Sequence, residues 1–297
     1  MRLVTFRQDN RESIGALVDE DNQIVDLCKA VPELPNEMQA FIRLGADGLG
    51  EIQDVVSSPA ENTLIAAASV KIMAPIPRPG RNIMCVGKNY HEHAKEFHSS
   101  GFDAAGKQAV PEQPIIFTKM PSSVIAPGEP IPTSNDATNS VDYEGELTIV
   151  IGPGGRDISK ADAFKHVYGY TIINDVTSRT QQHLYNQWFL GKSLDGFCPM
   201  GPAIVTVDEV GDVTKVRLLT KINGEVRQDA PVSDLIFDVP TLIETISRGR
   251  TLMAGDLIAT GTAAGVGIGF NPPKFLKPGD QIDITFDQIG TLSNPVS

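Results

Sequence analysis

The chain has 297 residues, of which 41% are hydrophobic and 21% are charged, so it is long enough for one large domain or a domain and a half. Its formal net charge of −12 would repel nucleic acid phosphates and anionic lipids, so neither is an expected partner. No apolar run approaches the roughly 20 residues that a membrane span needs, and three scattered cysteines (Cys28, Cys85 and Cys198) indicate reduced thiols rather than a disulfide framework.

The first 70 or so residues have the pattern of a small α+β unit. Short strands are predicted at 3–6, 13–18 and 23–27. Helices are predicted at 37–45 and 64–70. Because the strand pattern begins at once, no signal or transit peptide is apparent; we expect a cytoplasmic protein, with a mitochondrial location left open. Three prolines and a glycine in APIPRPG, 74–80, predict a linker, which gives a small domain at 1–73 and a larger one at 74–297.

The larger domain is predicted to be mainly β, so the fold class is α+β with a majority of strands. Strand-like runs are separated by glycine and proline turns, at 82–87, 114–119, 144–152, 167–175, 202–207, 216–224, 256–261 and 280–286. The segment 98–114 is small, polar and without periodicity, which predicts a long mobile loop of the kind that serves as a lid or binding loop.

A short helix is predicted in GKNYHEHAKEF, 87–97. Asn89 is a candidate N-cap, and Glu92 three residues later would complete a capping box. His93 and Glu96 then lie three residues apart on one helix face, within hydrogen-bonding reach. A histidine oriented by a carboxylate is a general-base arrangement, although an exposed ion pair has the same spacing.

Two glutamates lie one residue apart in the strand-like stretch VDYEGELTIVIG, 141–152. Glu144 and Glu146 therefore project from the same face, where two half-buried like charges would raise each other's pKa. Either they lie on a solvent-facing surface beside lysines of neighbouring strands, or a hard cation turns their repulsion into coordination.

Asp175, at the end of the strand-like run 167–175, is a third candidate oxygen ligand. It could also be a helix N-cap, but Asn174 and Thr177 compete for that place. Three carboxylates without a cysteine or histidine favour Mg²⁺, Mn²⁺ or Ca²⁺ over zinc. The sequence thus offers Glu144, Glu146 and Asp175 as a metal-ligand set.

Further polar residues follow in regions of apolar or glycine-rich sequence. Arg179 and Gln182 lie one helical turn apart and could face whatever Asp175 faces. Lys192, in WFLGKSLDGF, could stabilise an oxyanion, or could simply reach solvent. Thr262 lies in the loop TGTAAGVG, which lacks the P-loop and dinucleotide patterns and could hold a carboxylate or be only a turn.

In this order, the motifs resemble the fumarylacetoacetate hydrolase family. The resemblance rests on NIMCVGKNYHEHAKEF, PIIFTKMPSSVIAPG, VDYEGELTIVIG, YTIINDVTSRTQQ, QWFLGKSLDGFCPMGPAIV and AGDLIATGTAAGVG, from about residue 74 to the C-terminus. The QWFLGKSLDGFCPMGPA stretch and the small N-terminal unit are most similar to the fumarylacetoacetate hydrolase domain-containing protein 2 type.

The resemblance implies a mixed β-sandwich roll that holds one Mg²⁺ or Mn²⁺; Ca²⁺ would fit the same ligands in a crystal. It maps Glu144, Glu146 and Asp175 onto the metal ligands and His93 and Glu96 onto the base dyad, on a segment that orders when substrate arrives. It maps Lys192 onto a catalytic lysine beside the metal. Substrate-side residues of the family correspond to Lys119, Arg179, Gln182 and Thr262. A homodimer is also implied.

The implied chemistry is that of a small 2-oxo dicarbonyl acid and a metal-stabilised enolate. If His93 activates water, the reaction is C–C hydrolysis of an acylpyruvate-type substrate, which we expect first. Oxaloacetate tautomerisation or decarboxylation is the alternative, and hydratase or isomerase action on ring-cleavage products is a further one. A catalytically silent binding module is the competing class, and the intact dyad and Lys192 argue against it.

Two positions depart from the family pattern. Thr180 stands where an acidic residue is frequent, which we expect to loosen Arg179. Ala263 stands where proline is usual, which we expect to make the substrate loop more flexible. Neither change removes a proposed ligand or base.

Overall fold

The computed structural model describes residues 1–102 and 109–297. The centre of the segment predicted as a mobile loop, 98–114, therefore lies outside the described residues. The first two residues of that segment end a helix, α4 (His91–Ser99).

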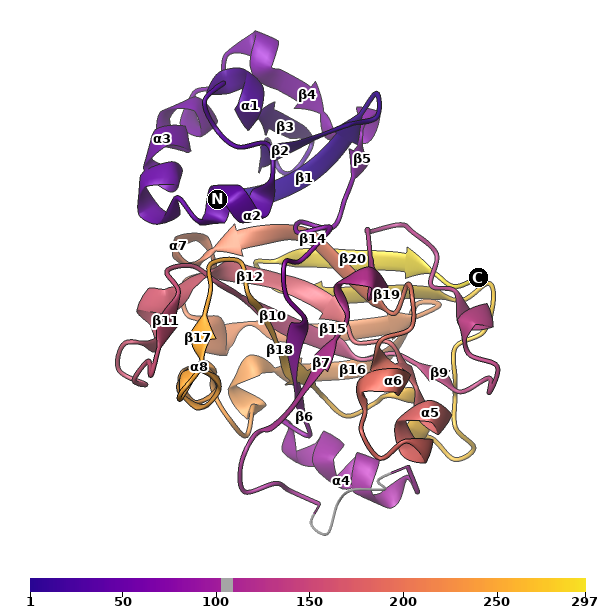
Figure 1. Ribbon diagram of the computed structural model, residues 1–297. Coiled ribbons are helices and arrows are strands. Elements are labelled where there is room, and N and C mark those ends of the chain that lie inside the picture. The colour runs from indigo at the N-terminus through magenta and orange to yellow at the C-terminus, as the bar shows by residue number, and fades with distance from the viewer. Residues whose placement is uncertain (103–108) are drawn as a thin grey trace.

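The N-terminal unit is an antiparallel sheet covered by short helices (Figure 1). Its strands are β1 (Arg2–Gln8), β2 (Arg11–Val18), β3 (Gln23–Asp26), β4 (Leu64–Ala66) and β5 (Lys71–Ile72), and its helices are α1 (Leu27–Ala30), α2 (Met38–Ile42) and α3 (Gly45–Ser57). Asp9 and Asn10 join β1 to β2 with positive φ at both residues, as a tight hairpin turn with the sheet's right-handed twist requires.

The prediction of a helix at 64–70 is wrong. Leu64 and Ile65 pair with Val25 and Ile24 of β3, and the alanines that follow form a single 3₁₀ turn. A seven-residue helix has little stability of its own, so pairing with a sheet edge outweighs the helix propensity of alanine.

The sheet continues from the N-terminal unit into the larger unit, because β1 pairs with β14. The order from there is β14 (Cys198–Thr206), β12 (Val167–Asn174), β10 (Gly145–Ile151), β18 (Leu257–Thr262), β6 (Ile83–Gly87) and β7 (Ile115–Lys119), with β8 (Val124–Ile125) added to β14. Neighbours in this path are antiparallel except for β18 and β6, which run parallel.

A second, antiparallel sheet packs against this one, which confirms the predicted α+β, mainly β class. Its order is β16 (Glu225–Pro231), β15 (Arg217–Ile222), β19 (Gln281–Phe286) and β20 (Gly290–Pro295). Two-stranded ribbons pair β9 (Val141–Asp142) with β13 (Thr177–Ser178), and β11 (Gly155–Arg156) with β17 (Thr251–Leu252). β10, β12 and β14 contact the second sheet, and the largest apolar cluster lies between the two layers.

β10 is buried along its whole length, not half-buried as its alternation indicates. Leu147, Ile149 and Ile151 face the second sheet, while Val150 belongs to an apolar cluster that includes Leu3 and Ile14 of the N-terminal unit. The two predicted domains thus share a core, and the boundary at 73/74 stays a prediction.

The remaining helices lie around the larger unit: α5 (Arg179–Leu184), α6 (Phe189–Lys192), α7 (Val207–Val210) and α8 (Val239–Ser247), with α4 beyond the end of β6 (Figure 1). The predicted capping box of α4 is wrong. The Asn89 amide donates to the carbonyls of Thr260 (2.7 Å) and Phe237 (3.1 Å), and the helix begins after Tyr90 without a side-chain cap. Glu92 is exposed and pairs with Lys95.

Candidate active site

Three carboxylates come together where β9, β10 and β12 meet. One oxygen each of Glu144, Glu146 and Asp175 lies within 4.8 Å of the others, and all three side chains are buried. The sequence prediction of this set agrees with the geometry.

Strand register produces this cluster. β10 and β12 pair with Gly145 opposite Asn174, so the residues beside that pair are neighbours. The Asp175 N–H donates to the Glu144 carbonyl (2.8 Å), and the Glu144 N–H donates to the Asn174 side-chain oxygen (3.0 Å). Neither Asn174 nor Asp175 caps α5, because Ser178 holds that place. The Asp175 carboxylate is therefore not used as a helix cap and can make other contacts.

Buried cations compensate two of the three carboxylates. Lys192 Nζ lies 2.7 Å from both Glu144 Oε2 and Asp175 Oδ2, and Arg179 Nη1 lies 2.7 Å from Glu144 Oε1. Burial raises the pKa of Glu144, but Lys192 and Arg179 outweigh it and hold that pKa at about 2. For Lys192, burial lowers the pKa, and Asp175 and Glu144 outweigh it, so the ammonium form is favoured. Solvent exposure of Lys192, the alternative from the sequence, is excluded.

Glu146 has no such compensation. The ion pairs of Lys192 and Arg179 go to other carboxylates, and the Glu146 carboxylate accepts a hydrogen bond from the Gly261 N–H (3.0 Å). Burial, then the charges of Asp175 and Glu144, raise the pKa of Glu146 well above its ordinary value. A divalent cation would remove this cost, and a hard, all-oxygen donor set suits Mg²⁺ or Mn²⁺. The residues therefore fit the implied metal.

The predicted dyad forms on α4. His93 Nδ1 lies 3.0 Å from Glu96 Oε2, and Glu96 Oε1 accepts a hydrogen bond from the Gly265 N–H (2.9 Å). His93 is buried and lines the pocket between the carboxylates and α4, so the pair is not the exposed ion pair that the spacing also allowed. The ring nitrogen not engaged by Glu96 is Nε2.

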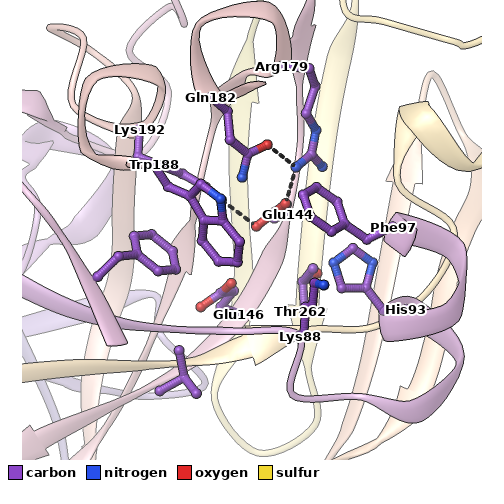
Figure 2. A pocket seen from close by; sticks show the side chains of 13 residues that line it. Lys88, His93, Phe97, Glu144, Glu146, Arg179, Gln182, Trp188, Lys192 and Thr262 are labelled. Atoms are coloured by element: carbon purple, nitrogen blue, oxygen red, sulfur yellow. Dashed lines mark hydrogen bonds and ion pairs between the residues drawn. The ribbon is translucent and has the colours of Figure 1, made fainter. Parts of the chain in front are cut away.

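The pocket brings most of the predicted site residues together (Figure 2). Gln182 Oε1 accepts a hydrogen bond from Arg179 Nη1 (3.1 Å). Thr262 Oγ1 donates to the Gly145 carbonyl and accepts from the Gln228 amide (2.7 Å). These side chains share the pocket wall with His93, Glu144, Glu146 and Lys192.

Lys119 does not line this pocket. Its ammonium lies 2.7 Å from Asp175 Oδ1 and donates to the backbone carbonyls of Val176 and Lys192. The structure thus places Lys119 behind Asp175, where it holds that carboxylate and α6, and not in the lining of the pocket.

Several lining residues were not predicted from the sequence: Val86, Gly87, Lys88, Phe97, Phe117 and Trp188. The apolar ones have the same sequence pattern as core residues. Lys88 carried a signal, because it directly follows a strand and precedes the His93 helix; in the structure its backbone has a positive φ of 54° and its side chain is buried.

The cavity is small, with a volume of about 10 Å³. That is room for about one water-sized sphere. A substrate therefore enters only when lining side chains move.

Thr180 does not loosen Arg179. Its N–H donates to Ser140 Oγ (3.0 Å), while Arg179 is fully buried and held by Asp142, whose Oδ2 lies 2.9 Å from Nε. Asp142 thus gives Arg179 an acidic partner although position 180 is a threonine. The Ala263 carbonyl accepts a hydrogen bond from Gln228, and the flexibility expected there stays a prediction.

Known proteins resemble this chain over its whole length. The family profile described as fumarylacetoacetate (FAA) hydrolase C-terminal matches residues 82–297. Oxaloacetate tautomerase YisK of Bacillus subtilis (strain 168) is 44% identical over 308 residues, which cover 100% of both chains.

Two solved structures show the same fold. Fumarylacetoacetate hydrolase from psychrophilic Exiguobacterium antarcticum has a TM-score of 0.82 and 41% identity, covering 100% of this chain and 99% of that one. Maleylpyruvate hydrolase from Sphingobium sp. SYK-6, in complex with manganese (II) ion and pyruvate, has a TM-score of 0.79 and 30% identity, covering 100% and 98%.

Proposed function

The chain belongs to the fumarylacetoacetate hydrolase family, and we propose that it is a divalent-metal-dependent enzyme that moves a proton on a small 2-oxo dicarboxylic acid, with oxaloacetate as the first candidate. The observation that carries this proposal is the buried cluster of Glu144, Glu146 and Asp175 with Lys192 between two of them. Keto–enol tautomerisation of oxaloacetate is the reaction that we place first.

Glu144, Glu146 and Asp175 would hold the cation, with Mg²⁺ as the proposed ion and Mn²⁺ as its substitute. The manganese in the maleylpyruvate hydrolase structure supports a divalent ion on this fold. When bound, the cation would act as a Lewis acid toward a substrate oxygen.

The side chains divide the remaining tasks. Arg179 and Gln182 present N–H donors at one wall of the pocket and suit a substrate carboxylate. Lys192 brings a positive charge to the site where negative charge develops on the 2-oxo oxygen. His93 accepts or returns the C3 proton through Nε2, while Glu96 fixes the ring through Nδ1.

One comparison favours tautomerisation over the hydrolysis that we expected first from the sequence. The relative with 44% identity over its full length is an oxaloacetate tautomerase.

C–C hydrolysis of an acylpyruvate-type acid is the second candidate. The contact between buried His93 and half-buried Glu96, at 3.0 Å, supports it, because the same base can activate water. A maleylpyruvate hydrolase shares the fold at 30% identity. Decarboxylation of oxaloacetate would use the same carboxylates and Lys192.

A parallel ultraviolet assay with added Mg²⁺ separates these reactions. It follows the enol absorbance of oxaloacetate, the loss of acetylpyruvate, and pyruvate through a coupled dehydrogenase. We expect faster enol–keto exchange without pyruvate; pyruvate would indicate decarboxylation, and loss of acetylpyruvate hydrolysis. Glu146→Gln is the control for contaminating activity. No turnover of either substrate by protein that binds Mg²⁺ would contradict the proposed substrate class.

A further inference from the structure

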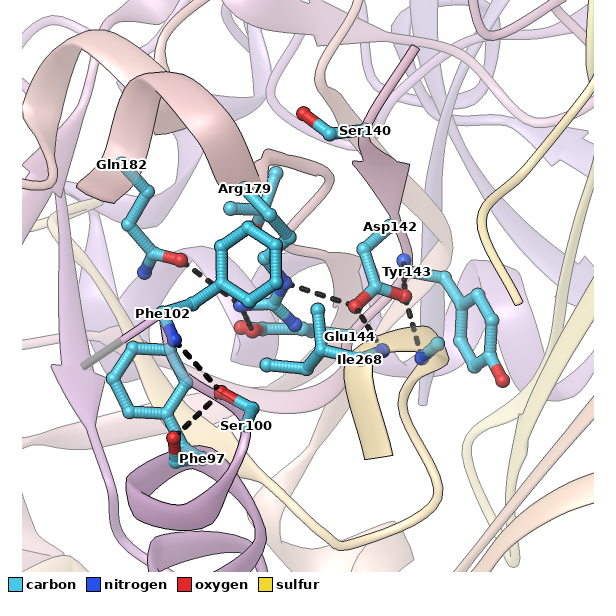
Figure 3. A network of polar contacts seen from close by, with 12 residues as sticks. Phe97, Ser100, Phe102, Ser140, Asp142, Tyr143, Glu144, Arg179, Gln182 and Ile268 are labelled. Atoms are coloured by element: carbon cyan, nitrogen blue, oxygen red, sulfur yellow. Dashed lines mark hydrogen bonds and ion pairs between the residues drawn. The ribbon is translucent and has the colours of Figure 1, made fainter. Parts of the chain in front are cut away.

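Asp142 is a buried carboxylate that the proposed chemistry does not use. It lies in β9, two residues before Glu144, and its side chain is completely buried. Oδ1 accepts hydrogen bonds from the N–H groups of Tyr143 (2.9 Å) and Gly267 (2.6 Å), and Oδ2 from Ile268 N–H (3.1 Å) and Arg179 Nε (2.9 Å). Figure 3 shows Asp142 between Arg179 and the chain at Ile268.

All four of these partners are donors. Only an ionised carboxylate accepts four such bonds on two oxygens, because the NH₂ group of an asparagine would face N–H groups instead. Hydrogen bonds to a charged acceptor are also shorter and stronger than neutral ones. These side-chain contacts therefore require aspartate at this position, whereas the backbone pairing of β9 with β13 does not.

One side of Asp142 leads to the metal ligands. Arg179 Nε is bound by Asp142, and Nη1 of the same guanidinium lies 2.7 Å from Glu144 and 3.1 Å from Gln182 Oε1. The planar guanidinium is fixed at both edges, so the position of Asp142 determines how Arg179 faces the pocket.

The other side of Asp142 leads to the base dyad. Gly267 and Ile268 belong to the loop that also contains Gly265, whose N–H donates to Glu96 Oε1. This loop fits tightly under Glu96: a Cβ on Gly269 would lie 1.8 Å from Glu96 Oε1. A shift of the loop would therefore move Glu96, and with it His93.

We propose that Asp142 is a positioning residue. It fixes the position of the substrate-side Arg179 relative to the 265–269 loop, which lies beneath the His93–Glu96 pair. The inference rests on the proposed function for the roles of Arg179 and the dyad. A continuous series of contacts then links Glu144 to His93 through Arg179, Asp142, the 265–269 loop and Glu96. Both halves of the site depend on one carboxylate.

Amide hydrogen exchange tests this proposal without any turnover. In Asp142→Asn, we expect exchange to accelerate about tenfold or more at Gly267 and Ile268, whose acceptor is weakened, and also at Gly265, whose acceptor is Glu96. If the role of Asp142 is purely local, exchange will accelerate at Gly267 and Ile268, while the exchange rates of Gly265 and α4 will equal those of the native protein. That second pattern would overturn the proposal.

Asp280→Asn is the matched control. Asp280 is also buried and accepts from a backbone N–H (Lys277, 3.0 Å) and a side-chain amide (Asn223, 2.9 Å), but it lies directly before β19 of the second sheet. We expect unchanged exchange in the 265–269 loop. If Asp142→Asn does not fold, Asp142→Glu keeps the charge and the same comparison decides.

Turnover gives a second readout on whichever substrate the enzyme accepts. Asp142→Asn should raise KM through Arg179 and lower kcat through the dyad, by roughly 10- to 100-fold together, as is usual for groups that orient a ligand or base. Arg179→Lys should mainly raise KM. If kcat of Asp142→Asn equals that of the native enzyme, the link to the dyad does not exist, whatever the substrate.

Discussion

Charge compensation explains how three carboxylates can be buried side by side. Lys192 and Arg179 neutralise Glu144, and Lys192 and Lys119 neutralise Asp175. Among the described residues, Glu146 receives a hydrogen bond from the backbone N–H of Gly261 and no ion pair. Burying a charge without a partner is costly, so Glu146 is where the folded chain most needs a cation.

Removal of Glu146 should therefore separate metal binding from folding. We expect Glu146→Gln to weaken Mg²⁺ binding by more than about 100-fold, since losing a partner behind a ligand already costs roughly 10- to 100-fold. The metal-free variant should melt no lower than the native protein, because glutamine carries no charge to bury. Calorimetric titration and thermal melting measure both, with exposed Glu92→Gln as the control. Normal Mg²⁺ titration of the variant would refute the ligand set.

The affinity for Mg²⁺ should also fall as the pH falls. Because the pKa of Glu146 is raised well above 4.5 in the metal-free fold, this carboxyl keeps its proton to higher pH than an ordinary glutamate. Mg²⁺ needs the ionised form, so its affinity falls as pH falls through the raised pKa, and binding releases a proton. Titrations in two buffers of different ionisation enthalpy count that proton. An affinity that does not change with pH would contradict the assignment.

The raised pKa of Glu146 also makes the free energy of unfolding depend on pH. A carboxyl with a raised folded-state pKa binds its proton more tightly when folded, so its contribution to the free energy of unfolding declines as pH rises from the unfolded-state pKa through the folded-state one. Added Mg²⁺ should restore that loss, since it binds only the folded site.

His93 carries the proton transfer in this proposal. We expect His93→Ala to keep its Mg²⁺ affinity and lose about 10²- to 10⁴-fold in kcat, the usual contribution of a general base. His91 lies exposed at the start of the same helix, so His91→Ala is the matched control and should retain activity. Native turnover by His93→Ala would show that another group moves the proton.

At the scale of elements, the loop after β18 connects otherwise separate parts of the site. Thr262 lines the pocket, the Gly265 N–H holds Glu96, and Gly267 and Ile268 hold Asp142. The loop needs glycine where neighbours come close: Gly265 has φ of +104°, and its Cβ would lie 1.8 Å from the Arg227 carbonyl. Its composition is therefore dictated by contacts on both sides.

Gly269→Ala should displace the dyad while the sheets stay folded. The new methyl group would lie 1.8 Å from Glu96 Oε1, so Glu96 must move away from His93. We expect kcat to fall by roughly 10- to 100-fold, with unchanged Mg²⁺ affinity, as for other groups that orient a catalytic residue. Gly50→Ala, in α3 with open space around the added Cβ, should keep native kinetics. Native kcat in Gly269→Ala would mean that Glu96 does not orient His93.

At the scale of the whole molecule, the N-terminal unit and the larger unit share one sheet and one core. Leu3 and Ile14 pack in the same cluster as Ile83 and Leu257, and β1 pairs with β14. Glu12 of β2 also pairs with Arg78 of the predicted linker. In the part of the chain that the structure describes, no helix is long and apolar enough to cross a membrane.

We propose that two copies of the chain form a homodimer, as the family resemblance implies. Large apolar side chains are exposed on β7, α5 and α6 or directly after β7 and α5: Ile116, Met120, Leu184, Tyr185 and Leu190. α6 contacts the other two elements. Exposed apolar groups that gather on neighbouring elements are typical of interfaces. Their position beside the pocket would place the second copy close to the site.

Light scattering during size exclusion should give twice the chain mass of 31.9 kDa. We expect Leu184→Asp to shift the protein toward the single-chain mass, because a charge at an apolar interface is not compensated. Met253→Asp changes a comparably exposed apolar residue outside these three elements and should stay dimeric. A native protein of single-chain mass would contradict the dimer, and a dimeric Leu184→Asp would contradict this surface.

The sequence by itself indicated most of the longer strands, the three carboxylates and the His93–Glu96 pair. Alternation, turn residues and the i, i+3 spacing are local signals, and the structure agrees with them for β10, β12 and α4. Locality also explains the errors: at 64–70 and at Asn89, a distant partner competes for the same residues and wins.

Only the tertiary structure decided how those pieces act together. Lys119 looked like a substrate ligand and lies behind Asp175, while Asp142, Lys88, Phe97 and Trp188 reach the site from elements far apart in the chain. Burial and the charge partners of Glu146 depend on which strands pair and in what register, and no window of sequence contains that information. The reason is physical: pKa values, cavity size and hydrogen-bond partners are properties of packed neighbours, and folding chooses those neighbours.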